Sequence, residues 1–358
     1  MSAPAIHEEV DRLLGLVPEN GVLGLGEPTH GSANVSEWKM AVLAELSGRG
    51  ALGVLAFEDS TLTGAHVDRV LPGGAECAEH LTDAWAEASS LWRTRAVVTG
   101  MERLARIAAT GSAHHFRFLG LDCHGGRRAA RRLVDLGASG GLIERLARGD
   151  ALTRSDAESL VEECRRLERA STERHELARH VRQYAEVYLI DPGEERLVLR
   201  DRFMAQELLA RGPEHGVTVV WAHNEHVARN EIGWAGPVMG AWLADALGRS
   251  YVAVGVLCGE GTARAVDPAS ENDDYRAVAL PSVRPEHTES ALAALGQNLV
   301  RGDELAHPRP RRFFGWSIDS RMVRAEPGSF DLARPSTDFD LLRWFPSSTA
   351  DETWVPDC

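Results

Sequence analysis

Five short apolar runs punctuate the chain, each bounded by glycine or by charged residues. They are 4 to 7 residues long and mostly continuous rather than alternating: Val22–Leu25, Leu52–Phe57, Phe116–Leu121, Val217–Trp221 and Tyr251–Leu257. Continuous apolar runs of this length are typical of strands buried on both faces of a parallel sheet. Stretches with helical spacing separate them. The pattern therefore predicts an α/β fold with a central, mostly parallel sheet flanked by helices.

The segment 126–212 has a different pattern, because it is rich in Arg, Glu and Leu and keeps helical spacing throughout. Ser155 with Glu158 matches a capping box, which predicts that a helix starts there. We interpret this segment as a helical insertion or subdomain. It would separate a first half of the α/β core, residues 1–125, from a second half with C-terminal strands, residues 213–358.

The composition of the chain serves mainly to exclude classes of protein. Hydrophobic residues make up 44% and charged residues 26% of the chain, which is ordinary for a soluble globular protein. The apolar runs are far shorter than the roughly 20 residues that span a bilayer, and no signal-peptide pattern opens the sequence. We therefore expect a cytoplasmic protein without a membrane partner. The five cysteines form no C-x-x-C pair, so neither a disulfide framework nor a thiolate zinc site is predicted.

The net charge of −14 bears on the partners. An acidic protein repels phosphate backbones, so we expect no nucleic-acid partner. The same long-range field favours a neutral or cationic small molecule as the ligand. Only one basic residue is a lysine, Lys39, and the other 38 are arginines.

Side chains capable of acid–base chemistry follow four of the five runs. They are Glu27 and His30 after the first run, Glu58 after the second, Asp122 and His124 after the third, and His223, Glu225 and His226 after the fourth. Any one of them alone is equally typical of a helix cap or a surface residue. Because the carboxyl ends of parallel strands meet at one edge of a sheet, we expect them to share one site.

Several blocks of sequence around these residues occur together and in order. They are Leu25–Gly31 with Phe57–Glu58, then Leu119–Asp122, Arg200–Ala205, Trp221–Ala228, Met239–Gly240, Tyr251–Gly255 and Phe339–Leu342. In this order, over roughly residues 20–345, they resemble the erythromycin esterase family. Trp221–Ala228 is the most specific block, and Phe339–Leu342 resembles the closing strand of that family.

The resemblance implies a hydrolase in which His30 is the general base that activates water. It implies that Glu27, Glu58, His223 and His226 are the other catalytic residues. It also implies a natural-product ester or lactone as substrate, in antibiotic resistance or biosynthesis. Macrolide specificity does not carry over, because the helical segment does not match the family in detail.

The other predicted site residues would bind substrate: Lys39, Asp122, His124 and Glu225. A basic residue in the first helix of the family is usually arginine, and here that position falls at Lys39. An arginine can grip a carbonyl or carboxylate in bidentate fashion and a lysine cannot, so this departure leaves the orienting role open. His124 has no role that the resemblance assigns.

The chemistry can also be stated from the residues themselves. A neutral imidazole at His30 would take a proton from water, Glu27 or Glu58 would orient it, and His223 or His226 would face the carbonyl oxygen. No G-x-S-x-G nucleophile elbow follows any of the five runs, so a serine nucleophile is not predicted.

Three alternatives stay open. We predict no cofactor, but two or three histidines with carboxylates could instead hold zinc or manganese. The same acid–base cluster could cyclise, eliminate or isomerise a natural-product intermediate without water attack, since a fold does not fix a reaction. A protein that only sequesters a small molecule is the third alternative.

Overall fold

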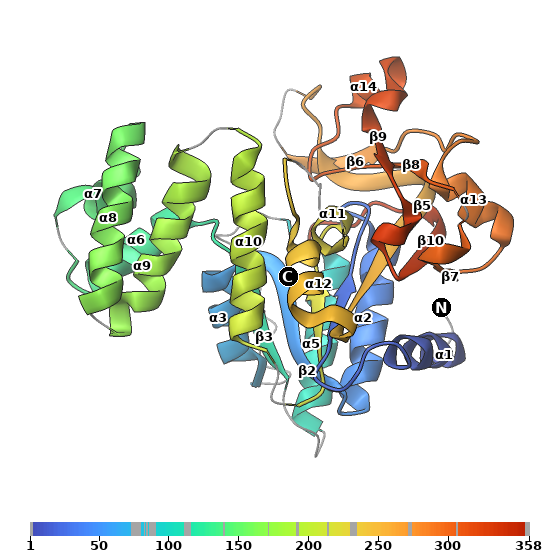
Figure 1. The fold of residues 1–358 in the computed structure, drawn as a ribbon, viewed down its shortest axis with the longest axis horizontal. Coiled ribbons are helices and arrows are strands. Elements are labelled where there is room, and N and C mark those ends of the chain that lie inside the picture. The colour runs from blue at the N-terminus through green and yellow to red at the C-terminus, as the bar shows by residue number, and fades with distance from the viewer. Residues whose placement is uncertain are drawn as a thin grey trace.

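The central sheet of the protein is mostly parallel, as predicted, and helices cover both of its faces (Figure 1). The computed structural model describes residues 3–72, 80, 81, 83, 85, 91–110, 116–138, 140–170, 172–190, 193–212, 215–229, 235–270, 274–305 and 307–354. The five apolar runs all form strands: β1 (Val22–Leu25), β2 (Leu52–Ser60), β3 (Arg117–Asp122), β4 (Val217–Trp221) and β5 (Tyr251–Val266).

The strand order is β3-β2-β4-β1-β5-β10-β7, and every pair from β3 to β10 is parallel. The closing strand β10 (Leu341–Ser348) pairs with β5, while β7 (Leu299–Arg301) adds an antiparallel edge. The long strand β5 continues past the sheet and pairs there with β6 (Tyr275–Ala279). A separate hairpin joins β8 (Arg309–Arg312) to β9 (Asp331–Arg334).

Successive residues of a strand point to opposite faces, and two hydrophobic cores result. In β2, Leu55 and Phe57 pack into one core with helices α1 (Ala3–Leu14), α2 (Ala33–Gly48) and α5 (Arg95–Thr110). Val54 and Ala56 pack into the other with α10 (Glu195–Ala210) and α12 (Met239–Leu247). Because both faces are covered, each strand needs apolar residues at every position, which explains the continuous runs.

The segment 126–212 consists of helices joined by short turns and loops in its described residues. Its helices are α6 (Gly126–Asp135), α7 (Gly141–Arg148), α8 (Arg154–Ala170) and α9 (Thr172–Ala185), with a π-helical turn (Glu186–Ile190) before α10. The helices α6–α9 lie to one side of the sheet and share a hydrophobic core of their own (Figure 1). The remaining helices are α3 (Thr61–Val70), α11 (Asn224–Val227), α13 (Thr288–Leu295) and α14 (Ser320–Ala325).

The predicted capping box at the start of α8 was wrong by two residues. The main-chain N–H of Thr153 donates to Asp156, and the N–H of Asp156 donates to the Thr153 hydroxyl, so these two residues cap the helix. Glu158 instead accepts a hydrogen bond from Arg154. Threonine can cap a helix as serine does, so the sequence offers two overlapping capping signatures here. The conformation of the chain before the helix decides which of the two forms.

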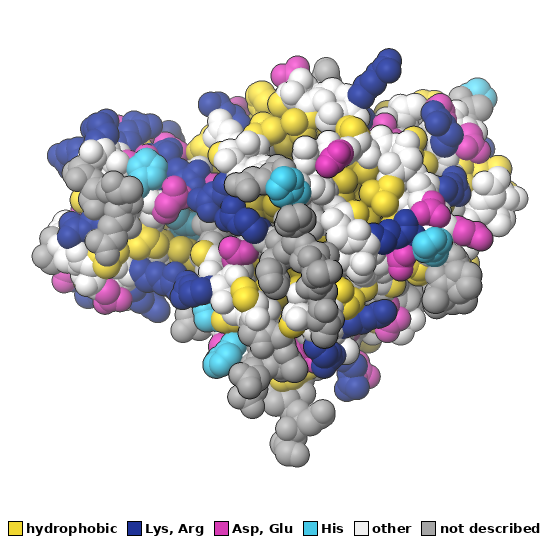
Figure 2. Space-filling model, turned by 90° about the horizontal axis from the view of Figure 1, so that it is seen from below, with side chains coloured by type: hydrophobic (Ala, Val, Ile, Leu, Met, Phe, Trp, Pro, Cys, Tyr) yellow, Lys and Arg dark blue, Asp and Glu magenta, His cyan; other side chains and the backbone are white. Residues whose placement is uncertain are grey.

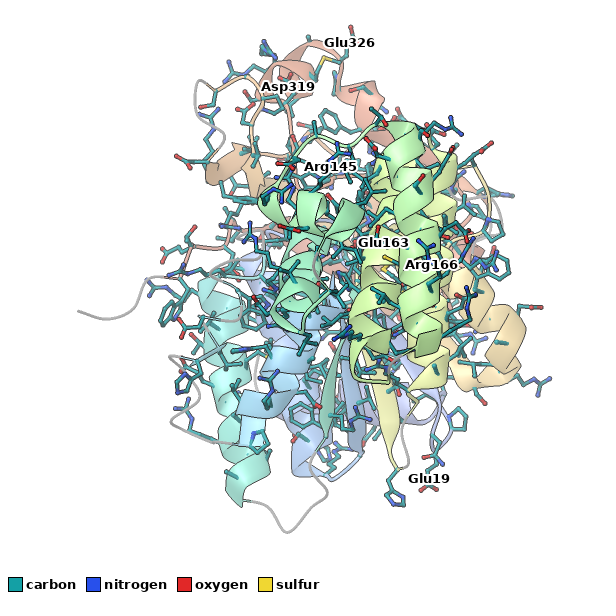
Figure 3. All side chains as sticks on the ribbon, turned by 90° about the vertical axis from the view of Figure 1, so that its left-hand side faces the viewer. Glu19, Arg145, Glu163, Arg166, Asp319 and Glu326 are labelled. Carbon is teal, nitrogen blue, oxygen red and sulfur yellow. The ribbon has the colours of Figure 1, made fainter. Side chains whose placement is uncertain are left out.

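Charged side chains dominate the surface of this helical part. Figure 2 shows basic side chains gathered over it with acidic ones between them. Arg145, Glu163 and Arg166 lie on its outward side in Figure 3. The same view places Glu19, just before β1, at the opposite end of the molecule from Asp319, so the carboxyl ends of the strands face the Asp319 end.

The first strand-end loop is held tightly against β5. The N–H groups of Arg264 and Asp351 both donate to the carbonyl oxygen of Gly31. A Cβ atom at position 31 would lie 1.9 Å from the Arg264 carbonyl oxygen, so only glycine fits this approach. Within the described residues, no helix is both long enough and apolar enough to cross a membrane.

Candidate active site

The carboxyl ends of the parallel strands open into a cavity of about 540 Å³, which we call the strand-end cavity. Six of the nine predicted site residues line it: His30, Glu58, Asp122, His124, His223 and His226. The other three are Glu27, Lys39 and Glu225, which are buried behind this lining. The rings of His30 and His223 are 5.7 Å apart, so the first and fourth strand ends do meet.

Glu27 and His30 form a hydrogen-bonded pair, the Glu27–His30 dyad. The Nδ1 atom of His30 lies 2.6 Å from Glu27 Oε1, and both side chains are buried. Burial raises the pKa of Glu27, but the charges of Lys39 and His30 outweigh it and hold that pKa below its usual value. An ionised Glu27 accepts the Nδ1 proton, which leaves Nε2 of His30 as the basic nitrogen on the cavity side.

Lys39 lies behind the dyad rather than in the cavity. Its Nζ atom donates to Glu27 Oε2 at 2.9 Å and lies 4.5 Å from the centre of the Trp221 ring. The indole N–H of Trp221 donates to the same oxygen at 2.6 Å. Complete burial lowers the pKa of Lys39 to about 8, although Glu27 offsets part of this shift. Lys39 therefore positions Glu27 and has no route to a substrate carbonyl.

Glu58 faces the basic nitrogen of the dyad. Its Oε2 atom lies 3.9 Å from His30 Nε2 and accepts the main-chain N–H of His223 at 2.9 Å. Its Oε1 atom accepts from Arg200 at 2.9 Å. Burial raises the pKa of Glu58, but His226, His30 and Arg200 outweigh it and keep the group ionised. A water molecule between His30 Nε2 and Glu58 Oε2 would contact both acceptors.

Arg200 is a cation that lines the cavity next to Glu58. Besides Glu58, it bonds Asp122 Oδ2 through two nitrogens, at 2.6 and 2.9 Å. These charges hold the pKa of Asp122 far below its usual range against the effect of burial. Arg200 lies in one of the sequence blocks that resemble the family, but the sequence predicted no role for it. Its third nitrogen, Nη1, lies 3.1 Å from His226 Nε2 and is not bonded to a carboxylate, so the N–H groups of Nη1 are the ones left to face a carbonyl oxygen.

His226 is an imidazolium locked between two carboxylates. Its Nδ1 atom lies 2.7 Å from Asp201 Oδ1, and its Nε2 atom lies 3.0 Å from Glu58 Oε1. Burial lowers its pKa, but Asp201 and Glu58 outweigh this and raise the pKa of His226 to about 10. Asp201, fully buried, also accepts the N–H of Met239 and was not predicted as a site residue.

His223 lines the cavity with its ring but offers no free nitrogen. Its Nε2–H donates to the carbonyl oxygens of Pro28 and Phe314, at 3.1 and 3.0 Å. Its Nδ1 atom accepts the N–H of Glu225 at 3.3 Å. Burial, with the neighbouring His30, lowers the pKa of His223 to about 4, so the ring is neutral at pH 7. This geometry favours Arg200 over His223 as the group that faces the oxyanion.

The side chain of Asn224 anchors the segment that carries both histidines. Its amide N–H donates to the carbonyl oxygen of Val256, and its oxygen accepts the N–H of the same residue, at 2.7 and 2.9 Å. The amide thus extends the ladder of β5 beyond the end of β1. Glu225 binds Arg311, which also contacts Asp338, all three being buried. Glu225 is therefore engaged in the fold and does not reach the cavity.

His124 stands on the cavity wall between two carboxylates. Its Nδ1 atom lies 3.1 Å from Asp122 Oδ2 and its Nε2 atom 3.1 Å from Asp59 Oδ1. Burial lowers its pKa, but Asp122 and Asp59 outweigh this and raise the pKa of His124 to about 10. Its side chain is 30% exposed, so the imidazolium is accessible from the cavity.

Four aromatic residues also line the cavity, and none of them was predicted from the sequence. They are Tyr188, Tyr275, Phe313 and Trp316. Trp316 is 57% exposed at the mouth. They come from the π-helical turn, from β6 and from the loop after β8, and no spacing in the sequence links these segments.

Other chemistry suggested by residue types has less support. Among the described residues, no group of three or more His, Cys, Asp or Glu side chains is arranged to hold a metal ion. The pattern G-x-S-x-G occurs once, at residues 137–141, but it follows helix α6 rather than a strand, and Ser139 lies outside the described residues. Cys123, Cys164 and Cys258 are buried free thiols, and Cys77 and Cys358 are not among the described residues.

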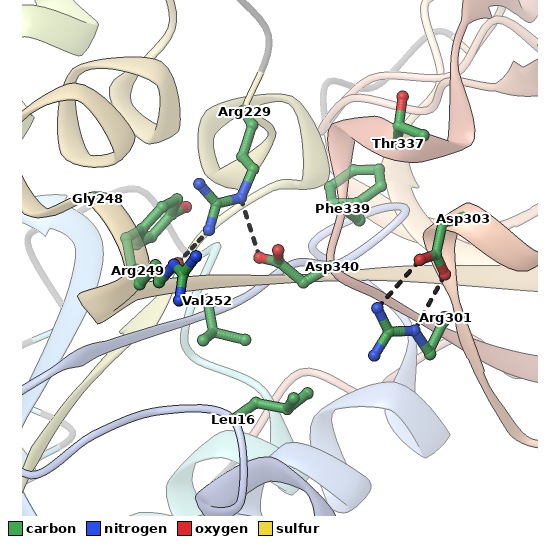
Figure 4. Close-up of a pocket in the computed structure, with 11 residues that line it drawn as sticks. Leu16, Arg229, Gly248, Arg249, Val252, Arg301, Asp303, Thr337, Phe339 and Asp340 are labelled. Carbon is green, nitrogen blue, oxygen red and sulfur yellow. Dashed lines mark hydrogen bonds and ion pairs between the residues drawn. The ribbon is translucent and has the colours of Figure 1, made fainter.

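A second cavity, of about 610 Å³, lies at the opposite edge of the sheet, where β5 and β10 begin (Figure 4). Its charged groups are mostly paired, Arg229 with Asp340 and Arg301 with Asp303. No histidine is among the described residues that line it. The histidines among the predicted site residues line the strand-end cavity instead.

Comparison with known proteins gives one family and several similar folds. The family model described as erythromycin esterase matches residues 53–348, which is most of the chain. The match begins after the first strand-end loop, so Glu27, His30 and Lys39 lie outside it. No curated protein matches the sequence.

Three solved structures share the fold. A protein from Bacillus cereus is 18% identical with a TM-score of 0.74, over 99% of this chain and 94% of its own. A succinoglycan biosynthesis protein is 18% identical with a TM-score of 0.73, over 97% and 92%. A histidine-to-asparagine mutant of the erythromycin esterase EreC, in its open conformation, is 15% identical with a TM-score of 0.68, over 96% and 95%.

Proposed function

The chain belongs to the erythromycin esterase family, which supports a hydrolase-like function, and on this premise we propose that it hydrolyses an ester or lactone by general-base activation of water. The substrate is a small natural product. The observation that carries the proposal is the Glu27–His30 dyad, whose free Nε2 faces Glu58 in the cavity beside Arg200.

His30 acts as the general base. Its Nε2 atom takes a proton from a water molecule held between His30 and Glu58, while the water oxygen attacks the carbonyl carbon of the substrate. Glu27 fixes the tautomer and stabilises the imidazolium that forms, as the acid of a catalytic triad does. The imidazolium then returns the proton to the departing alkoxide, and the products are an acid and an alcohol.

Arg200 stabilises the oxyanion of the tetrahedral intermediate. Glu58 and Asp122 hold its guanidinium in place from two sides, so little reorganisation is needed when the negative charge develops. His226 holds the Glu58 carboxylate in place through its Nε2 atom and would contribute positive charge to the site at longer range. Removing one donor to an oxyanion typically lowers kcat by about 10²–10³.

Variants of His30 in the dyad and of Arg200 test this mechanism. With 4-nitrophenyl acetate and a panel of lactones, His30→Asn and Arg200→Met should each lower kcat by at least about 10²-fold while the fold persists. His7→Gln is the matched control, because His7 is a histidine whose side chain is 60% exposed at the surface. Rates like those of the wild type in both site variants would end the proposal.

Isotope labelling separates hydrolysis from its rivals. In water enriched in oxygen-18, the acid product should gain one labelled oxygen, whereas cyclisation, elimination or isomerisation incorporates none. Metal analysis of untagged protein, with turnover measured after chelator treatment, tests the alternative of a metal-held water. A protein that only sequesters its ligand would bind every analogue and turn over none.

A further inference from the structure

Arg196 is a cation of the strand-end cavity that the proposed mechanism does not use. It lies in the first turn of α10, is partly buried, and lines the cavity. Among the described residues, no side chain or carbonyl group is bonded to its guanidinium. The two carboxylates that line the cavity, Glu58 and Asp122, are both bonded to Arg200 instead. A guanidinium without a carboxylate partner in a cavity is available to an anionic ligand.

The helix sets the distance between this cation and the reacting centre. Arg196 and Arg200 are four residues apart on α10, so they lie on the same face, about 6 Å apart along the helix axis. Arg200 lies beside the dyad, where the carbonyl oxygen of a substrate would bind. A group held by Arg196 would therefore lie about one helical turn from the bond that breaks.

The charges around the cavity are close to balanced, except at Arg196. The imidazolium groups of His124 and His226 each lie between two carboxylates, and Arg200 is bonded to Glu58 and Asp122, whereas Arg196 has no carboxylate partner among the described residues. Charges on the outer surface are screened over about 8 Å at physiological ionic strength, so the groups inside the cavity decide what binds. Arg196 therefore favours an anionic group at this point of the cavity, whereas the long-range field predicted a neutral or cationic ligand.

We propose, on the basis of the ester hydrolysis proposed above, that Arg196 binds an anionic group of the substrate. The substrate class is then a small ester or lactone that carries a carboxylate or phosphate about one helical turn from its scissile carbonyl. The aromatic wall at Phe313 and Trp316 packs against the apolar body of the same molecule. Arg196 selects the substrate, and Arg200 acts on the reacting group.

Kinetics with a matched pair of esters test the assignment. The probes are 4-nitrophenyl hydrogen glutarate and its methyl ester, which differ only in the negative charge. The wild type should favour the anionic ester in kcat/KM by about 10- to 100-fold, the range for a charge-assisted hydrogen bond. Arg196→Gln should bring this ratio close to 1. Arg202→Gln, which removes an exposed arginine of the same helix outside the cavity lining, should leave the ratio unchanged.

Binding of an unreactive analogue keeps the test independent of turnover. Glutaranilic acid replaces the ester by an amide, and its affinity relative to its own methyl ester can be measured by calorimetry. If neither ester is hydrolysed but the wild type prefers the anionic amide and Arg196→Gln does not, the proposed hydrolysis fails and the Arg196 site stands. Competition by succinate or by inorganic phosphate distinguishes the two anionic groups. A wild type without preference for the anion, or an unchanged preference in Arg196→Gln, overturns the assignment.

Discussion

Glu27 neutralises a buried cation and, in the proposed mechanism, orients the general base, and a pair of substitutions can separate these two roles. Its carboxylate accepts from His30 at 2.6 Å, from Lys39 at 2.9 Å and from Trp221 at 2.6 Å. Glu27→Gln keeps the shape but removes the charge. Lys39 then loses the carboxylate that holds its charge in a fully buried place, and a loss of about 3–5 kcal/mol in the free energy of unfolding is expected.

The same substitution should also remove most of the activity. A glutamine at position 27 can either accept a hydrogen bond from His30 Nδ1 or donate one to it. The imidazole can therefore carry its proton on Nε2, which is the wrong tautomer for a base. In a catalytic triad, exchanging the acid for its amide lowers kcat by about 10⁴-fold. We expect a loss of about 10³–10⁴-fold in kcat for Glu27→Gln, with a small change in KM, because substrate does not touch Glu27.

Replacing Lys39 as well should restore stability without restoring activity. In the double variant Glu27→Gln, Lys39→Met, an unbranched apolar side chain packs on Trp221 in place of the ammonium group. Exchanging a buried ion pair for apolar or neutral groups is often close to neutral, so the free energy of unfolding should return to within about 1 kcal/mol. Urea unfolding and kcat on 4-nitrophenyl acetate, measured on all four members of the cycle, provide the comparison.

Two outcomes would refute this reasoning. If the double variant recovers kcat along with stability, then Glu27 serves only to neutralise Lys39 and the dyad has no catalytic role. If Glu27→Gln alone keeps kcat within about tenfold of the wild type, the tautomer of His30 does not depend on Glu27.

Two further predictions concern stability. The pKa of His124 is about 10 in the folded protein, above the roughly 6.5 of an unfolded imidazole, so its ion pairs stabilise fully below pH 6.5 and are lost as pH rises through 10. The difference in free energy of unfolding between wild type and His124→Gln should therefore shrink over this range in denaturation series, and a constant difference would contradict the ion pairing. Gly31→Ala should cost several kcal/mol, because its Cβ would overlap the Arg264 carbonyl oxygen, whereas Gly48→Ala, with no atom within 4 Å, should be neutral or stabilising by up to about 1 kcal/mol in thermal unfolding. Equal melting temperatures for these two glycine variants would show that the loop can move aside.

The sheet could be predicted because burial on both faces leaves a strong local signal. Each of the strands β1–β5 contains a continuous apolar run, and the polar residues that follow four of these runs lie at the same end of the sheet. Glu27, His30 and Glu58 could be grouped on that basis, before any contact between them was visible. Their roles as base and supporting acids stay predictions that the variants above test.

The residues that reasoning from the sequence missed lie where no local pattern identifies them. Arg200 is 142 residues from Glu58 along the chain, and it is one of 38 arginines, most of them on helix surfaces. His223 looked like a catalytic residue, but its nitrogens are bonded to Pro28, Phe314 and Glu225. Main-chain groups of distant loops are invisible in a pattern of side chains, so the sequence does not distinguish an imidazole with a free nitrogen from one whose nitrogens are both bonded.

The two sides of the strand-end cavity are built from different parts of the protein. On one side, the loop of Trp316 is hydrogen-bonded to the far end of β5, the strand that also lies in the middle of the sheet. On the other side, Tyr188 and Arg196 follow helices that pack around their own core. Substitutions within that separate core can therefore reshape one wall of the cavity while the residues at the strand ends stay the same, and His180 of α9, whose ring contacts the carbonyl oxygen of His124, is a point where the two parts meet.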